Sequence, residues 1–144
     1  MEDITVRSYE PRDYGDVRQN LEDGQLFYAE MDAEERLNEK INRNPGSILV
    51  AETKGMVVGN VLFMEDGWGP LAFRLAVRKE YRGRGVGTQL MKSVEDVLRD
   101  RGYPEVHILV GENETELKEY YAKMGYEEGN LYRWLYKDLR KGRS

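Results

Sequence analysis

The chain has 144 residues, with 22 Lys and Arg against 27 Asp and Glu, so its formal net charge is −5. It has no cysteine and a single histidine, His107, which excludes disulfides, a thiolate nucleophile, iron–sulfur clusters and cysteine or multi-histidine metal sites. The acidic balance argues against a nucleic-acid partner, and no apolar run approaches the ~20 residues of a membrane span. We therefore expect a soluble cytoplasmic protein without a metal site, folded as one domain over residues 1–144.

The first half of the chain predicts a strand, two helices and an antiparallel meander. Apolar and polar residues alternate over residues 4–9, and Pro11 is placed to begin a helix near Arg12. A second helix is expected to start at Asp32 as its N-cap, with Glu35 three positions later. Three strand-like runs joined by tight turns then follow, over residues 47–53, 56–64 and 71–77.

In the second half the apolar residues change to helical spacing. They predict a helix over Gly87–Arg101, ended by glycine at position 102. A short strand over residues 106–110 has few polar residues, as in a strand covered on both faces, and we interpret His107 within it as a structural histidine. A last helix over residues 115–124 and an aromatic-rich closing strand over residues 131–139 complete the chain.

The order of these elements defines the expected fold class. It is a mixed α+β fold with a mostly antiparallel central sheet flanked by helices. The strand–helix–strand passage from residue 71 to residue 110 predicts one parallel pair within that sheet.

Residues 82–88, Arg-Gly-Arg-Gly-Val-Gly-Thr, stand between a strand and the start of a helix. Their glycines allow the main chain to approach a ligand without Cβ atoms, and the first N–H groups of the helix point toward that ligand. Residues 78–84 carry four cations and one carboxylate, a local charge of +3. The pattern indicates an anion site made mostly of backbone, with a tight structural turn as the alternative. It matches neither a P-loop nor a dinucleotide-binding fingerprint.

This loop resembles the acetyl-CoA loop of the GCN5-related N-acetyltransferases (GNAT), which reads Arg/Gln-x-x-Gly-x-Gly/Ala and falls here on Arg82–Gly87. Leu75–Tyr81 is similar to the family's fourth strand and the loop after it, and Tyr121–Tyr126 to its Tyr-x-x-x-Gly-Phe/Tyr signature. The resemblance covers nearly the whole chain in element order and looks closest to short single-domain prokaryotic members. It implies the GNAT acyl-CoA N-acyltransferase fold, in which strands four and five are parallel and splay apart.

The resemblance also implies acetyl-CoA as cosubstrate and transfer of the acetyl group to a primary amine in a ternary complex. Main-chain N–H groups would hold the pyrophosphate, with Arg82 or Arg84 adding side-chain charge. The residues implied at the cofactor loop are Arg82, Gly83, Arg84, Gly85, Val86, Gly87 and Thr88. The pantetheine arm would lie along the strand residues Leu75, Ala76 and Val77.

Two residues are implied in the chemistry. An amide near Leu75 would polarise the thioester carbonyl as negative charge develops on it. Tyr121 would protonate the departing thiolate, because a phenol with a pKa near 10 keeps its proton at neutral pH. The alternative for Tyr121 is simple packing against the sheet.

Some positions depart from the family pattern. Many relatives have Asn seven residues before the tyrosine, where this chain has Glu114, with Asn113 one position earlier. The glutamate that some relatives carry on strand four is Leu71 here, so no general base is evident. The candidates for a base acting through water, each also interpretable as a surface carboxylate, are Glu65, Asp66 and Glu30.

The acceptor amine is not specified by any motif. Carboxylates are concentrated over residues 22–35, which suggests a cleft that attracts a cationic small molecule or peptide. Phe27, Tyr28 and Trp68 are expected to border this cleft, with ordinary core or rim packing as the alternative. The rival functions are a protein N-terminal acetyltransferase and a non-catalytic acetyl-CoA-binding regulatory module. Residues 131–139 offer a strand for pairing in a homodimer.

Overall fold

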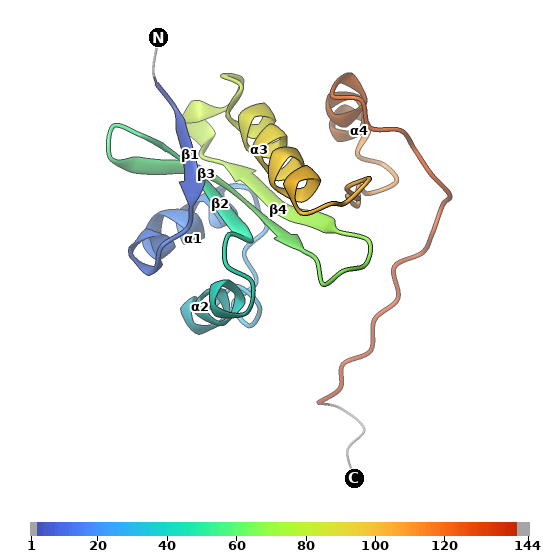
Figure 1. The fold of residues 1–144 in the computed structure, drawn as a ribbon, viewed down its shortest axis with the longest axis horizontal. Helices are drawn as coiled ribbons and strands as arrows, with labels where there is room; N and C mark the ends of the chain where they lie inside the picture. The colour runs from blue at the N-terminus through green and yellow to red at the C-terminus, as the bar shows by residue number, and fades with distance from the viewer. Residues whose placement is uncertain (1–2, 141–144) are drawn as a thin grey trace. The chain divides into compact units, whose positions relative to one another are not determined.

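The computed structural model describes residues 3–140 (Figure 1). They form two compact units, of which the first ends at Leu109 and the second begins at Val110. Each unit is described by itself.

The first unit contains a four-stranded antiparallel sheet. Its strands are β1 (Thr5–Ser8), β2 (Ile48–Thr53), β3 (Met56–Met64) and β4 (Leu71–Val77), in the order β1-β2-β3-β4. The predicted hairpin between β2 and β3 is confirmed, since Lys54 and Gly55 both have left-handed φ angles, 51° and 77°. A two-residue turn with positive φ at both positions matches the twist of paired strands.

Helices cover both faces of this sheet. Helices α1 (Tyr14–Asp23) and α2 (Glu34–Arg43) lie on one face, and α3 (Val86–Asp100) lies on the other (Figure 1). A 3-10 turn, η1 (Pro11–Asp13), leads into α1, so the predicted helix near Arg12 begins as a tighter turn. A second such turn, η2 (Lys79–Tyr81), follows β4. The predicted helix over 87–101 is confirmed with a shift of one residue.

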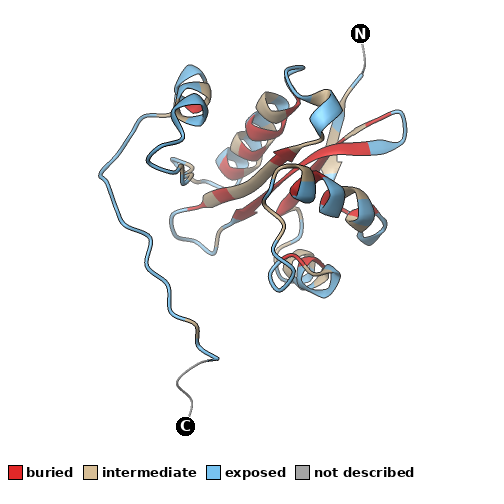
Figure 2. Cartoon of the chain, turned by 180° about the vertical axis from the view of Figure 1, so that it is seen from behind, coloured by how far each residue is buried: buried red, intermediate tan, exposed pale blue. Residues whose placement is uncertain are grey.

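Strand β3 is the centre of the packing. Seven consecutive residues, 57–63, are buried, because helices cover both faces of the strand (Figure 2). Gly59 has the tightest surroundings: a Cβ there would lie 2.9 Å from Val86 Cγ1 and 3.1 Å from Leu90 Cδ1. The absence of a side chain at Gly59 therefore allows the first turns of α3 to approach the sheet closely.

The predicted strand over residues 106–110 is reduced to one parallel bridge, between Leu71 and His107. Ala72 N–H donates to the His107 carbonyl and His107 N–H to the Pro70 carbonyl, both at 2.9 Å. The parallel direction is confirmed at this point, but the expectation of a strand covered on both faces is wrong, since the His107 side chain is 53% exposed. Within the described part of the first unit, the outer edge of β4 beyond residue 72 has no strand beside it.

The second unit contains α4 (Thr115–Lys123), which ends before Gly125 at φ 95°. The predicted closing strand over residues 131–139 is wrong: those residues form no strand and no backbone hydrogen bond within the described chain. A run rich in aromatic and apolar residues favours a strand, but a strand also needs an edge to pair with. The large side chains left exposed are Leu131, Tyr132, Trp134, Leu135, Tyr136 and Leu139.

The approach of α3 to β3 can be tested with two glycine variants. We expect Gly59→Ala to lower the free energy of unfolding by about 1–3 kcal/mol, because the new methyl group overpacks against Val86. The control is Gly15→Ala inside α1, where a Cβ meets nothing within 4 Å, and we expect it to stabilise the protein by about 0.5–1 kcal/mol. Urea unfolding measures both, and a Gly59→Ala protein as stable as the wild type would contradict the packing.

Candidate active site

The glycine-rich loop is formed as an open turn at the N-terminal end of α3. Gly83 and Gly85 have left-handed φ angles of 76° and 81°, and Gly85 is the residue that precedes the helix. A Cβ at either position would meet no atom within 4 Å, so these glycines are required by backbone conformation and not by crowding. As the N-cap, Gly85 has no side chain to offer to the first N–H groups of α3. These N–H groups have no acceptor within the helix itself, which is the general feature that lets a helix N-terminus bind an anion.

The two arginines of the loop have different surroundings. Arg82 donates from Nε to the Val77 carbonyl and from Nη2 to the Asp23 carbonyl, both at 3.1 Å. It therefore ties the loop to the end of β4 and to the end of α1. Arg84 is exposed, and its guanidinium lies 5.1 Å from the centre of the Tyr81 ring.

Strand β4 contains a bulge that the sequence did not reveal. Leu62 pairs with Phe73 and Asn60 with Ala76, so Arg74 and Leu75 together face the single residue between them on β3. Arg74 has a φ of 58°, a left-handed conformation that non-glycine residues adopt uncommonly. The bulge takes Leu75 out of the regular ladder, at the position where the family resemblance implies an amide that meets the thioester.

A buried set of polar side chains surrounds this bulge. Asn60 donates from Nδ2 to the Arg74 carbonyl at 3.0 Å, and Asn20 donates to Asn60 Oδ1 at 3.1 Å. Arg78 completes this series of hydrogen bonds by donating from Nε to Asn20 Oδ1 at 3.0 Å. Both asparagines are fully buried, where an amide without partners is costly. The sequence signal that could have pointed to this polar set is Asn60, an asparagine inside the otherwise apolar run of residues 56–64.

Asp32 connects the bulge to the loop that follows α1. Its Oδ1 accepts from Arg74 Nε at 3.1 Å, and its Oδ2 accepts from the Tyr28 N–H at 2.8 Å. The predicted role of Asp32 as N-cap of α2 is wrong, because Ala33 is the N-cap and makes no side-chain bond. The carboxylate is buried and turned toward Arg74 and the loop instead.

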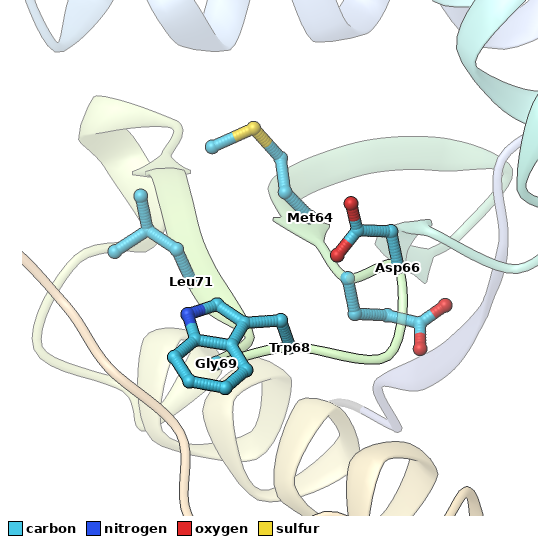
Figure 3. Close-up of a pocket in the computed structure, with 6 residues that line it drawn as sticks. Met64, Asp66, Trp68, Gly69 and Leu71 are labelled. Atoms are coloured by element: carbon cyan, nitrogen blue, oxygen red, sulfur yellow. The ribbon is translucent and has the colours of Figure 1, made fainter.

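A shallow pocket of about 330 Å³ lies at the turn between β3 and β4. Figure 3 shows Trp68 beside Gly69 and Leu71, with Met64 extending from the end of β3. The remaining lining residues are Glu65 and Asp66. Trp68 is 85% exposed, so it borders the pocket as a rim residue.

Glu65 does not have the surroundings of a general base. Its carboxylate accepts hydrogen bonds from Tyr103, Asn44 and Arg101. The Tyr103 hydroxyl and the positive Arg101 hold the pKa of Glu65 below its ordinary value despite some desolvation. These contacts tie the turn to α3 and make Glu65 a structural carboxylate.

Tyr121 lies in the second unit, on α4. It is buried, and its ring makes edge-to-face contacts with Tyr120 and Tyr126 at centroid distances of 5.2 and 5.4 Å. Burial raises its pKa to about 12, with a smaller contribution from Tyr120. The phenol therefore keeps its proton throughout the physiological range. At the start of the same helix, Glu114 is the N-cap, and Asn113 is exposed.

Among residues 3–140, no group of three or more His, Cys, Asp and Glu side chains is arranged to hold a metal ion. None of the helices in that range is long and apolar enough to cross a membrane.

The structure is that of an α+β protein with an open glycine-rich loop at the N-terminal end of α3, and comparisons with known proteins identify its family. A model of the GNAT acetyltransferase domain matches residues 44–128. An acetyltransferase of Yersinia pestis is 34% identical over 124 residues, which cover 86% of this chain and 88% of that protein. The chain therefore belongs to the GNAT acetyltransferase family.

Solved structures agree with the fold. Ard1 from Thermoplasma volcanium has a TM-score of 0.78 at 22% identity, covering 88% of this chain and 84% of that one. The PaiA N-acetyltransferase of Thermoplasma acidophilum, solved in complex with coenzyme A, has the same TM-score at 18% identity, covering 90% and 93%.

Proposed function

We propose that this protein transfers the acetyl group of acetyl-CoA to a primary amine of a small molecule, and that residues 1–144 act as one acetyltransferase domain. The observation that carries the proposal is the open, left-handed glycine loop at the start of α3, tied by Arg82 to the strand edge of β4. The family match supports the single domain, because residues 44–128 span the division after Leu109. With no cysteine to carry an acetyl group, the amine attacks the thioester directly.

The loop is proposed to bind the pyrophosphate of the cosubstrate. N–H groups of residues 84–88 would donate to its oxygens, and the positive end of the α3 dipole would stabilise its charge. The exposed Arg84 side chain is the charged partner in this proposal, while Arg82 ties the loop to two backbone carbonyls. The proposed contacts explain how an acidic protein binds a polyanion.

The loop proposal predicts different effects from two alanine variants. Both Gly85→Ala and Gly102→Ala force a left-handed alanine, at the two ends of α3, and both should cost about 1–2 kcal/mol of stability. Only Gly85→Ala should also weaken coenzyme A binding, by about tenfold, because it turns the N–H groups of the loop. Calorimetric titration measures the Kd, and equal affinities in the two variants would reject the loop as the binding site.

The strand edge is proposed to hold the pantetheine arm and the reacting carbonyl. The outer edge of β4 at Leu75, Ala76 and Val77 has no neighbouring strand within the described part of the first unit, although the Val77 carbonyl already accepts from Arg82. The Leu75 N–H would donate to the thioester oxygen as charge develops on it. Removing such a donor in other enzymes costs roughly 3–4 kcal/mol.

Tyr121 is proposed as the acid of the reaction. The neutral amine forms the new C–N bond, the C–S bond breaks, and the phenol gives its proton to the thiolate while the amine loses its own to solvent. A pKa of about 12 supports this assignment, because the group stays protonated at every pH where the amine becomes neutral.

Replacing the phenol tests this role. Tyr121→Phe should lower kcat by tenfold or more with little change in KM for acetyl-CoA, while Tyr120→Phe, the neighbouring ring, serves as the control. In the wild type the rate should rise with pH as the amine deprotonates, without loss of the tyrosine acid below about pH 10. Full activity of Tyr121→Phe would remove it from the mechanism.

The overall proposal is tested by release of coenzyme A thiol from acetyl-CoA in the presence of amines. We expect turnover with cationic small amines, since Asp66 lines the pocket at the β3–β4 turn and Glu34 and Glu35 are exposed on α2. Turnover only with N-terminal peptides would favour the protein acetyltransferase. Binding of acetyl-CoA without turnover on any amine would favour a regulatory module.

A further inference from the structure

The bulge of β4 is unusual in its first residue. A bulge whose first residue is left-handed is normally made with glycine, because a Cβ clashes in that conformation. Here the residue is Arg74, with a φ of 58°. Strained backbone of this kind persists only where the surrounding structure holds it, and it is concentrated at functional sites.

Two side chains hold Arg74, one at its backbone and one at its guanidinium. Asn60 donates to the Arg74 carbonyl at 3.0 Å, and Asp32 accepts from Arg74 Nε at 3.1 Å. Only the Asn60 contact acts on the backbone of the bulge. Asn60 is in turn oriented by Asn20, which is fully buried and accepts from Arg78 Nε.

We propose that Asn60 is a positioning residue for acetyl transfer: its amide holds the Arg74 carbonyl, fixes the left-handed bulge, and so aims the Leu75 N–H at the thioester oxygen. This inference rests on the proposed function, because it needs Leu75 to meet the acyl group. Asn60 itself is not proposed to contact the substrate. It acts on the site through the Arg74 carbonyl.

The chemistry explains why an asparagine is needed. The extra residue of a bulge loses its place in the ladder, so the carbonyl of Arg74 needs a donor from outside the ladder. Asn60 supplies one from the neighbouring strand, while its own oxygen is satisfied by Asn20. An aliphatic residue at position 60 would remove this donor from the Arg74 carbonyl, and it would leave the Asn20 amide with the Val57 carbonyl as its remaining acceptor.

The test is the kinetics of Asn60→Ala beside Val50→Ala. Val50 is the residue on β2 that pairs with Asn60, and it is equally buried. Because its side chain is a hydrocarbon, it cannot donate a hydrogen bond to the bulge. We expect both variants to melt at lower temperature. Below their melting range, only Asn60→Ala should lose kcat, by about tenfold or more, with Kd for coenzyme A within about threefold of the wild type.

A second change separates positioning from general damage. Adding Arg74→Gly to Asn60→Ala should restore part of the lost kcat, because glycine adopts the left-handed conformation without strain. If Asn60→Ala does not fold, Asn60→Ser, which keeps a hydroxyl for Asn20 but is too short to hold the bulge, replaces it with the same expectation.

Crystal structures of the variants give a readout independent of turnover. We expect φ at Arg74 to leave the left-handed region in Asn60→Ala. Retention of the left-handed angle, or an unchanged kcat in the folded variant, would overturn the proposal. If the wild type itself shows no turnover with any amine, the proposed function fails, and the φ angle alone decides whether Asn60 holds the bulge.

Discussion

The site depends on two adjacent residues of the central strand β3. Gly59 faces α3, and its missing side chain lets Val86 and Leu90 pack against the sheet, which sets the position of the loop in front of that helix. Asn60 faces the other layer and bonds to the bulge of β4. Because successive residues of a strand point to opposite faces, one strand positions both the glycine loop and the bulge. We therefore expect changes to either residue to affect the proposed cofactor site.

The acidic composition and the proposed polyanionic ligand are compatible because the loop uses backbone groups. The N–H groups at the start of α3 carry partial positive charge whatever the side chains are, and the local excess of cations over residues 78–84 adds to it. Arg82 donates hydrogen bonds to the Val77 and Asp23 carbonyls, so its main contribution to the proposed site is to hold the loop in place. The net charge of −5 is a property of the whole chain, while the proposed anion site depends on the N–H groups and cations close to the loop.

The sequence predicted the elements whose signals are local. The glycines of residues 83–87, the apolar face of α3 and the Lys54–Gly55 hairpin all fall within a few residues, so their spacing was sufficient. The bulge at Arg74 could not be predicted, because the side chains that contact Arg74, Asn60 at its carbonyl and Asp32 at its guanidinium, are distant in sequence. Residues 131–139 have the aromatic-rich composition of a strand, but pairing depends on an edge, which composition does not supply.

An NMR titration of the amide-labelled protein with coenzyme A and, separately, with acetyl-CoA tests the proposed backbone site most directly. We expect both ligands to shift the amide signals of residues 84–88, and acetyl-CoA alone to produce a further shift at Leu75, since only it has the thioester oxygen. Shifts confined to other parts of the chain, or identical Leu75 signals with the two ligands, would contradict the backbone site described for the loop and the bulge.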